Sequence, residues 1–382
     1  MIPAYVDALC KEIEFVELNC RRRQLPSPTV HTIFFGGGTP SLLSPLQFAS
    51  IFKRLRTSFP LTEDAEVTIE ANPGTVTYEA LSQLHEIGIN RISFGVQSAN
   101  VFELKMLERA HSFFDVIEAV TSARKAGFDN LNLDLIYGLP EQTLQTWQTT
   151  VQRILDLHPE HISAYALTLE HGTPFGRWAS KGLLPLPDPD LAAEMYEWAS
   201  EKLEENGYVQ YEISNWAKHV ERQKSNFQPS TLDLRRLRPA FACKHNLQYW
   251  RGLPYLAFGA GAHGYAGGYR YSNVLRIKTY IERLTNYQIA NFEFPLTSAT
   301  VNHHKQTLQD DMSEYMLNNL RLVRTGASEA DFRSRFGKGL MDVYPAEIIE
   351  LMRLELLERD GEIIRLTRRG RLLGNQVFMR FV

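Results

Sequence analysis

Five apolar stretches rich in β-branched and aromatic residues alternate with helical patterns between residues 30 and 205. Strand-like runs that each precede a helical pattern are typical of a parallel sheet whose neighbouring strands are connected by helices. Gly88, Gly127 and Gly207 follow helical patterns, at the position where glycine often ends a helix. We therefore expect strands at residues 30–35, 66–70, 91–96, 130–136 and 162–167, followed in turn by helices at 45–58, 77–87, 100–108 with 113–126, 143–157 and 189–205.

Residues 2–22 carry apolar side chains at helical spacing among charged ones, so the chain opens on a helix. The repeating units of a (βα) barrel begin with a strand. The pattern thus predicts that residues 1–217 have an α/β fold, either a parallel sheet or a (βα) barrel, and the opening helix is unusual for a barrel. We expect the natural gene to encode further residues before Met1.

The remaining chain divides into three parts by composition. Residues 218–240 are basic and poor in apolar side chains, which predicts an exposed loop. Residues 241–300 connect this loop to residues 301–382, where three helical patterns and a short turn-and-strand pattern predict a small winged-helix-like domain. Such domains can bind DNA, but the basic stretch near residue 368 is too short to support that role.

Composition excludes several classes of protein. The 382 residues have a formal net charge of -3, which gives no general attraction to nucleic acid. No apolar run reaches the roughly 18 residues of a membrane-spanning helix. The three cysteines, Cys10, Cys20 and Cys243, lack the spacing of a metal motif, and an odd number argues against a disulfide framework. We expect a cytoplasmic protein without a nucleic-acid partner or transmembrane segment.

Polar residues and glycines lie at or near the carboxyl ends of the expected strands. Ligands of parallel α/β folds lie outside the carboxyl ends of the strands, so these residues should share one rim. Carboxylates and an amide there suit a ligand with hydroxyl and amino groups. The simpler alternatives are that the glycines only form a tight turn, that the carboxylates only cap helices and that Gln97 is a turn residue. The candidate residues are Gly36, Gly37, Gly38, Thr39, Glu70, Gln97 and Asp134.

A second cluster, Cys243-Lys-His-Asn-Leu-Gln-Tyr-Trp250, places a histidine among aromatic residues. Without further context, a histidine that packs beside core aromatic side chains is the simpler interpretation.

The segments FFGGGTPSLL, TIEANPGT, RISFGVQS, ERAHS and LDLIYGLPEQT together resemble the radical S-adenosylmethionine family. More narrowly, they resemble its branch of heme chaperones and oxygen-independent coproporphyrinogen III dehydrogenases. The resemblance implies that residues 36–39 and Glu70 bind the methionine amino end of S-adenosylmethionine. It implies that Gln97 and Asp134 hold the ribose hydroxyls and that Arg109 lies near the methionine carboxylate. From its position alone, Arg109 would be a solvated arginine at a helix end.

The pattern His-Asn-x-x-Tyr-Trp is similar to the heme-associated motif of the chaperones in this branch. The resemblance implies a heme site formed by His245, Asn246, Tyr249 and Trp250, with His245 as the ligand of the heme iron. Cys243 is the alternative ligand, because in an extended backbone it would share a face with His245. A heme-acceptor protein would be the partner, and a peripheral contact with a membrane at the acceptor is left open.

The chain departs from the family at one motif. The family holds a [4Fe-4S] cluster on Cys-x3-Cys-x2-Cys, and this chain has no such motif, so iron–sulfur ligands are absent from it. Residues 2–22 are similar to the family helix that follows the first barrel strand, so the resemblance implies that residues 1–217 form a partial, TIM-like (βα) radical-SAM barrel whose first strand is missing. The favoured function is a heme-binding chaperone that also binds S-adenosylmethionine. The alternatives are an oxygen-independent coproporphyrinogen III oxidase of porphyrin biosynthesis and a non-catalytic remnant that binds a protein partner.

Overall fold

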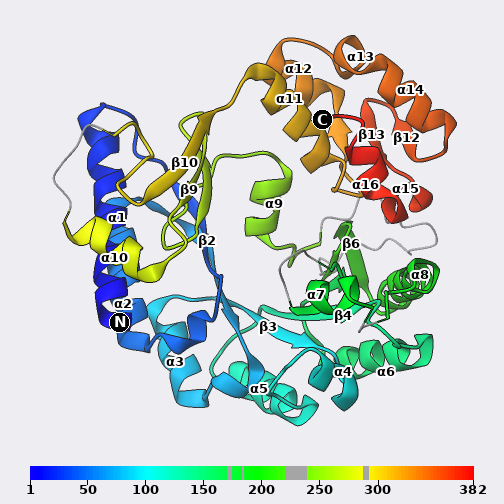
Figure 1. Cartoon of the computed structure of the whole chain (residues 1–382), viewed down its shortest axis with the longest axis horizontal. Helices are drawn as coiled ribbons and strands as arrows, with labels where there is room; N and C mark the ends of the chain where they lie inside the picture. Colours follow the sequence, from blue (N-terminus) through cyan, green and yellow to red (C-terminus); the bar gives the residue numbers. More distant parts are fainter. Residues whose placement is uncertain (170–173, 183–184, 220–238, 287–291) are drawn as a thin grey trace, which may run out of the picture.

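The structure is a computed structural model that describes residues 1–169, 174–182, 185–219, 239–286 and 292–382. Figure 1 shows a strongly curved sheet with helices along its outer side, and a short helix, α9, in the middle of the arrangement. The C-terminal domain lies beside the end of the sheet formed by β6. Most of the predicted basic loop, residues 220–238, lies outside the described residues.

The main sheet has seven strands in the order β1-β2-β3-β4-β5-β7-β6. Strands β1 to β5 pair in parallel, whereas β7 is antiparallel to both β5 and β6. The five predicted strand–helix units are therefore confirmed as an open, curled half-barrel. The strands are β1 (Val30–Phe35), β2 (Leu61–Ala71), β3 (Arg91–Gln97), β4 (Leu131–Tyr137), β5 (His161–Ala166), β6 (Tyr208–Glu212) and β7 (Asn215–Lys218).

The helices of this half-barrel begin at side-chain caps in several places. Ser44 and Thr143, for example, cap α2 and α6 through capping boxes. The helices are α1 (Ile2–Arg22), α2 (Pro45–Ser58), α3 (Tyr78–Ile87), α4 (Val101–Met106), α5 (Phe113–Lys125), α6 (Leu144–Leu155), α7 (Pro174–Ser180) and α8 (Pro189–Glu205), with short 3-10 turns η1 (Pro40–Leu42) and η2 (Pro73–Thr75).

The two faces of the curled sheet differ in chemistry. On β2, Val67 and Ile69 belong to the hydrophobic core beneath the outer helices. Successive side chains of a strand point to opposite faces, so Glu66, Thr68 and Glu70 share the other, concave face. Strands β3, β4 and β5 repeat this alternation. The concave face therefore carries the polar groups that form the candidate site.

A smaller antiparallel sheet and α9 occupy the middle of the chain. The sheet has the order β10-β9-β8, and α10 packs beside α1 (Figure 1). Because β10 pairs with β9, residues 300–305 join this sheet and the C-terminal domain follows them. The elements are α9 (Lys244–Trp250), β8 (His263–Ala266), β9 (Tyr269–Asn273), α10 (Ile277–Thr285) and β10 (Thr300–Lys305).

The C-terminal domain has its own hydrophobic core, which includes Met316, Phe332 and Ile348. The three predicted helices correspond to α11, α12 and α14, and the predicted strand corresponds to β13, whereas α13, α15, α16, β11 and β12 were not predicted; the sheet has the order β11-β13-β12. The elements are α11 (Leu308–Asn319), β11 (Ala327–Ser328), α12 (Glu329–Phe336), α13 (Leu340–Val343), α14 (Pro345–Arg353), β12 (Leu357–Asp360), β13 (Ile363–Leu366), α15 (Arg368–Leu372) and α16 (Gly374–Phe378).

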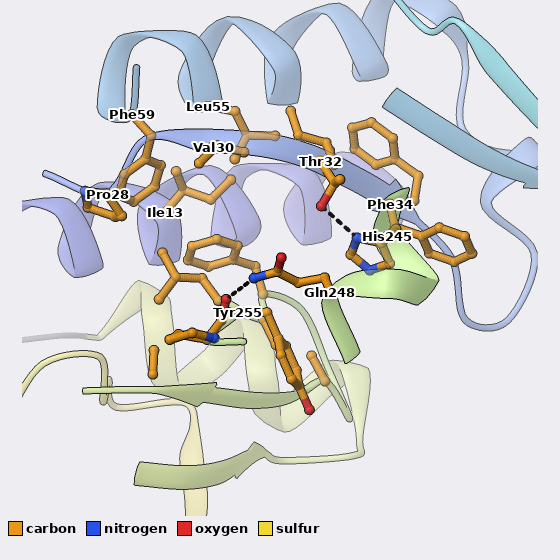
Figure 2. A pocket seen from close by; sticks show the side chains of 18 of the residues that line it. Ile13, Pro28, Val30, Thr32, Phe34, Leu55, Phe59, His245, Gln248 and Tyr255 are labelled. Carbon is orange, nitrogen blue, oxygen red and sulfur yellow. Dashed lines mark hydrogen bonds between the residues drawn. The ribbon is translucent and has the colours of Figure 1, made fainter. Parts of the chain in front are cut away.

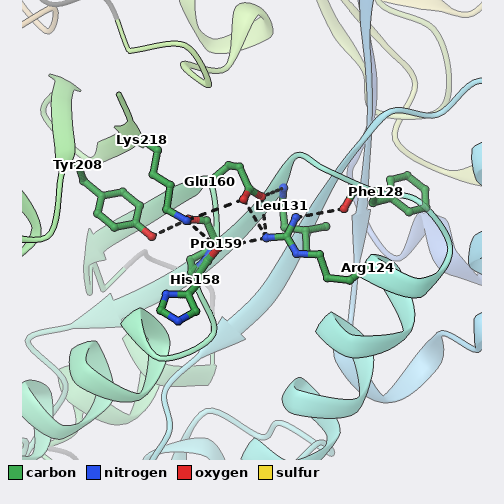
Figure 3. Close-up of polar contacts among 8 residues, drawn as sticks. All are labelled: Arg124, Phe128, Leu131, His158, Pro159, Glu160, Tyr208 and Lys218. Carbon is green, nitrogen blue, oxygen red and sulfur yellow. Dashed lines mark hydrogen bonds and ion pairs between the residues drawn. The ribbon is translucent and has the colours of Figure 1, made fainter. Parts of the chain in front are cut away.

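A polar cluster fastens the sheet at the ends where β4 and β5 begin (Figure 3). Glu160 accepts hydrogen bonds from Arg124 at the end of α5, at 2.9 Å, and from the backbone N–H of Leu131, at 3.1 Å. Lys218 of β7 lies 3.9 Å from the same carboxylate. The cluster is at the opposite ends of the strands from the predicted rim, so we assign it to stability.

Several local predictions were wrong. Strand β4 begins at Leu131 and ends at Tyr137, so the predicted range of 130–136 was displaced by one residue, and Asp134 lies within both ranges. The backbone from residue 244 is helical where an extended segment was expected. The short strand β7 was missed because its residues carry no alternating pattern. In the described part of the chain, no helix is both long and apolar enough to cross a membrane.

Candidate functional site

The loop after β1 brings exposed backbone next to a carboxylate. The backbone N–H of Gly37 donates to Glu70 Oε2 at 3.1 Å. Gly37 and Gly38 have φ values of 80° and 66°, which favour glycine. A Cβ at Gly36 would overlap the Phe34 ring and lie 3.0 Å from Glu70 Oε2. The sequence Gly36-Gly37-Gly38 is thus required by the backbone conformation and by the close approach of Glu70.

Glu70 and Asp134 lie on the same concave face. Burial raises the pKa of Glu70, the Gly37 N–H opposes this effect, and the Asp134 charge adds to it. Asp134 accepts a hydrogen bond from Ser93 of β3 at 2.8 Å. Two carboxylates in one half-buried concavity form a site that attracts a cation or several hydroxyl donors.

Gln97 and Arg109 complete the cluster that we call the adenosyl rim: residues 36–39, Glu70, Gln97, Arg109 and Asp134. Gln97 ends β3 with a φ of 69°, a left-handed conformation that costs a non-glycine residue roughly 1–2 kcal/mol. Strain of this kind is often retained at binding sites. Arg109 donates to Asn72 Oδ1 at 3.3 Å, which holds it beside the end of β2.

Helix α9 lies within the curl of the sheet, where a buried acid of β2 caps its N-terminus. The carboxylate of Glu66 accepts the backbone N–H groups of Lys244 and His245, each at 3.0 Å. It also faces the Cys243 thiol, with Sγ 3.4 Å from Oε1. Orphan N–H groups of a first helical turn require such acceptors. Glu66 therefore fixes the position of the helix that carries the His-Asn-x-x-Tyr-Trp pattern.

The His245 imidazole is held on three sides, and Figure 2 shows the sides formed by Thr32 and Phe34. Its Nδ1 lies 3.0 Å from Thr32 Oγ1, and its Nε2 lies 3.0 Å from the Tyr249 hydroxyl. Its ring stacks on Phe34 with 4.9 Å between centroids. Burial lowers the pKa of His245 to about 4, although the Glu66 charge opposes this shift. The ring is therefore neutral at physiological pH.

The other residues of the pattern point in different directions from α9. The half-buried Asn246 follows His245 directly on the helix. The Arg321 guanidinium of the C-terminal domain lies 4.4 Å from the centre of the Trp250 ring. Tyr249 packs edge-on against His245. The four predicted heme residues thus share one helix, but one face of Trp250 is already covered.

A cavity of about 520 Å³ lies beside α9, between α1, β1 and the segment near residue 256 (Figure 2). Its lining is mainly apolar and includes Ile13, Phe34 and Leu256, while His245 and Tyr249 reach it from α9. Strand β1 is the edge strand of the sheet on this side. The cavity thus offers apolar walls, an imidazole and an unpaired strand edge.

The three cysteines do not form a cluster site. Cys10 and Cys20 lie on α1, and Cys243 precedes α9. Burial raises the pKa of each thiol, that of Cys243 to about 12. Among the residues that the structure describes, no group of three or more His, Cys, Asp or Glu side chains is arranged to hold a metal ion. These residues do not fit an iron–sulfur cluster.

Sequence reasoning missed Glu66, Asn72 and Arg91. Arg91 is fully buried on the concave face beside Cys243 and Glu66. Glu66 had a detectable signal, because Glu66, Thr68 and Glu70 alternate with Val67 and Ile69. Asn72 and Arg91 are single polar residues next to apolar runs and carry no comparable pattern.

Comparison with known proteins connects these features to a family. Residues 19–154 match the radical SAM superfamily, and residues 306–373 match the HemN C-terminal domain. The chain is 36% identical to the heme chaperone HemW of Bacillus subtilis (strain 168), over 100% of this chain and 92% of that protein. The chain belongs to the HemW family. The HemW of Lactococcus lactis subsp. lactis (strain IL1403) is 33% identical over 100% of this chain and 90% of that protein.

The solved structure of coproporphyrinogen III oxidase (HemN) from Escherichia coli superposes with a TM-score of 0.74. It is 23% identical and covers 99% of this chain and 82% of that chain. At this identity the match establishes the shared fold, including the half-barrel and the C-terminal domain. Membership of the radical SAM superfamily and of the HemW family confirms the resemblance predicted from the five sequence segments.

Proposed function

We propose that this chain is a heme chaperone that binds heme at α9 and S-adenosylmethionine at the adenosyl rim, and that it passes heme to an acceptor protein. One observation carries the proposal: the His-Asn-x-x-Tyr-Trp pattern lies on a helix held inside the half-barrel of a HemW-family chain. The acceptor would be recognised by the chaperone's surface.

The chemistry of the adenosyl rim supports S-adenosylmethionine. Glu70 can accept from the ammonium group, and Asp134 can accept from ribose hydroxyls. The open space beside Gly37 and Gly38 leaves room for a ligand against exposed backbone. Gln97 and Arg109 add an amide and a cation, which suit a ribose hydroxyl and a carboxylate. Bound S-adenosylmethionine would supply a sulfonium group, and the residues of this chain would orient it.

The protonation state of each candidate residue favours His245 over Cys243 as the ligand of the heme iron. A neutral imidazole is the form that binds a metal, and His245 is neutral above a pKa of about 4. A thiol binds metal as a thiolate, whereas burial raises the pKa of Cys243 to about 12. Coordination through Nε2 requires the Tyr249 hydroxyl to turn away. The cavity beside α9 would cover the porphyrin with apolar walls.

Hemin titration tests the heme site. His245→Ala should shift the Soret band and weaken hemin binding by roughly tenfold or more, since an axial bond is lost. Lys244→Ala, on the same helix with its side chain exposed and paired with Asp64, is the matched control and should leave both unchanged. If His245→Ala and Cys243→Ser each leave the spectrum and the affinity unaltered, α9 is not the heme site.

The S-adenosylmethionine site is tested separately by calorimetry. Removing one charged hydrogen bond should cost roughly 1.5–3 kcal/mol, about a tenfold to hundredfold loss of affinity. Asp134→Asn should therefore weaken binding measurably. If S-adenosylmethionine binds the double variant Asp134→Asn/Glu70→Gln as tightly as the unaltered chain, the adenosyl rim is not its binding site.

A coproporphyrinogen oxidase is the alternative, because the solved HemN structure shares the fold. Fold alone does not determine function, and the cysteines of this chain do not fit an iron–sulfur cluster. Incubation with coproporphyrinogen III and S-adenosylmethionine separates the two functions. Loss of carboxyl groups from the porphyrinogen would support the oxidase, and hemin binding without turnover would support the chaperone.

A further inference from the structure

Helix α9 is too short to be stable on its own. It has seven residues, whereas an isolated helix in water is marginal below about 12 residues. The last carbonyl groups of a helix have no partners within it, and cations near that end interact favourably with the helix dipole. Glu66 of β2 satisfies the N-terminal end. The stability of α9 therefore also depends on what contacts its C-terminal end, where Trp250 is the last residue.

Two arginines of the C-terminal domain contact that end. Arg335 of α12 donates from Nη1 to the carbonyl oxygen of Arg251, the residue after α9, at 2.8 Å. The guanidinium of Arg321, two residues after α11, lies 4.4 Å from the centre of the Trp250 ring. Helices α11 and α9 are in contact (Figure 1). Both charges are therefore placed where the dipole of α9 favours a cation, and the Glu66 carboxylate occupies the opposite end.

The contact between α9 and the C-terminal domain is incompletely hydrogen-bonded. Trp250 Nε1 and Arg321 Nε are buried and have no hydrogen-bond partner among the residues that the structure describes. Arg321 Nη2 lies 3.8 Å from Glu212 Oε2 of β6, which is an ion pair but longer than a hydrogen bond. Buried donors without acceptors are costly, and water would satisfy them if the two parts separated. The contact thus holds α9, but these donors offset part of its stabilising energy.

We propose that Arg321 and Arg335 are positioning residues for the heme site: the C-terminal domain holds α9 in the helical form that presents His245, and separation of this domain from α9 lets heme leave. This inference rests on the proposed function. His245 lies five residues before the end of α9, so fraying by roughly one and a half turns reaches it. An acceptor protein that draws the C-terminal domain away from α9 would thereby obtain the heme.

Transfer of hemin to excess apomyoglobin measures the rate of release. Arg321→Met and Arg335→Met should each raise this rate by roughly threefold, the effect of one cation at a helix end, and the double variant by roughly tenfold. Arg335→Lys keeps a cation and should release hemin nearly as slowly as the unaltered chain. Arg368→Met is the matched control, because Arg368 also joins the C-terminal domain to the half-barrel, but through Glu201 of α8, at 3.3 Å. Its release rate should be unchanged.

Hydrogen exchange of the heme-free chain gives a second readout. The amides of residues 244–250 should exchange faster in Arg321→Met and Arg335→Met than in Arg368→Met. Glu160→Gln, which weakens the far end of the sheet, controls for a general loss of stability. If hemin release or α9 exchange in the arginine variants matches that of Glu160→Gln, the positioning role is overturned while hemin binding, and with it the proposed function, stands. Failure of the unaltered chain to bind hemin would overturn both.

Discussion

The carboxylate of Glu66 on β2 accepts the backbone N–H of His245 at 3.0 Å, so a residue 179 positions away caps the helix that carries the proposed heme ligand. Glu66 is 6% exposed and serves two backbone N–H groups and a thiol. The short helix has no side-chain cap from its own N-cap residue, Cys243. Its position inside the half-barrel therefore depends on Glu66.

We predict that Glu66→Ala destabilises the chain by roughly 2–3 kcal/mol, because a buried charged acceptor of several hydrogen bonds is lost. Hemin binding should weaken as well, since α9 loses its anchor. Urea unfolding and hemin titration measure the two effects. Asp64→Ala, which removes an exposed carboxylate paired with Lys244, is the control. A Glu66→Ala protein as stable as this control would show that the cap is dispensable.

Gly36→Ala should weaken both sites at once. The added Cβ would overlap the Phe34 ring, which stacks on His245, and would approach Glu70. We expect loss of S-adenosylmethionine affinity in calorimetry and a shifted hemin spectrum. Gly74→Ala is the matched control, since its Cβ would meet only His111 at an ordinary 3.5 Å. An unchanged hemin spectrum in Gly36→Ala would contradict the support of His245 by Phe34, and unchanged S-adenosylmethionine affinity would contradict the role of Glu70.

Tyr249→Phe should leave hemin affinity unchanged or increase it. The Tyr249 hydroxyl lies 3.0 Å from His245 Nε2, the nitrogen proposed to bind iron. Phenylalanine keeps the aromatic face and frees the nitrogen. Tyr249→Ala removes the face as well and should weaken binding. A large loss of hemin affinity in Tyr249→Phe, seen in the Soret titration, would argue that the phenol itself contacts heme.

The order of the strand–helix units could be predicted because each unit carries a local signal. Apolar runs, Ser44 and Thr143 at helix starts, and Gly88 and Gly127 just past helix ends all lie within a few residues of the boundaries they set. The location of the rim residues on one edge of the sheet could then be predicted, since parallel strands bring their carboxyl ends together. The predicted end of the strand that contains Asp134 differed by one residue, because the apolar Leu-Ile-Tyr run continues the strand to Tyr137.

The environment of α9 could not be predicted in the same way. Residues 243–250 lack a strong helical pattern, and the cap that stabilises the helix comes from β2. The Thr32 and Tyr249 bonds to His245, and the Arg321 contact with Trp250, also depend on the tertiary fold. Side chains that meet only after the sheet has curled leave no trace in local sequence.

The depressed pKa of His245 predicts a specific dependence of stability on pH. The folded chain keeps the ring neutral down to a pKa of about 4, whereas the unfolded chain takes up the proton near 6.5. Between these values the unfolded state binds more protons, so stability rises with pH. This contribution to the free energy of unfolding is complete above about pH 6.5 and is lost as the pH falls toward 4, on the order of 3 kcal/mol in total.

The difference between the unaltered chain and His245→Gln isolates this contribution from other titrating groups. These include Glu12, whose pKa is raised by burial to about 7, and His161, whose pKa is lowered by burial. Urea midpoints measured from pH 4 to pH 8 should show a shallower acid-side slope for His245→Gln. Identical slopes for the two proteins would mean that His245 is not held neutral by the fold.

Glu160→Gln should reduce stability without changing either ligand affinity. Its carboxylate joins Arg124, the Leu131 backbone and Lys218 where β4 and β5 begin (Figure 3). The glutamine keeps the shape but loses the charge, and the arginine and lysine are about one-third exposed. Because water screens such pairs, we expect a loss of roughly 1–2 kcal/mol in urea unfolding.

Glu201→Gln serves as the control for Glu160→Gln, because its pair with Arg368 is largely exposed on both sides and should contribute nothing measurable. The Glu160 cluster lies at the opposite ends of the strands from the adenosyl rim. A Glu160→Gln protein that is less stable but binds hemin and S-adenosylmethionine normally would show that this end of the half-barrel serves stability alone. Weakened binding of either ligand, measured where the protein is fully folded, would contradict that division.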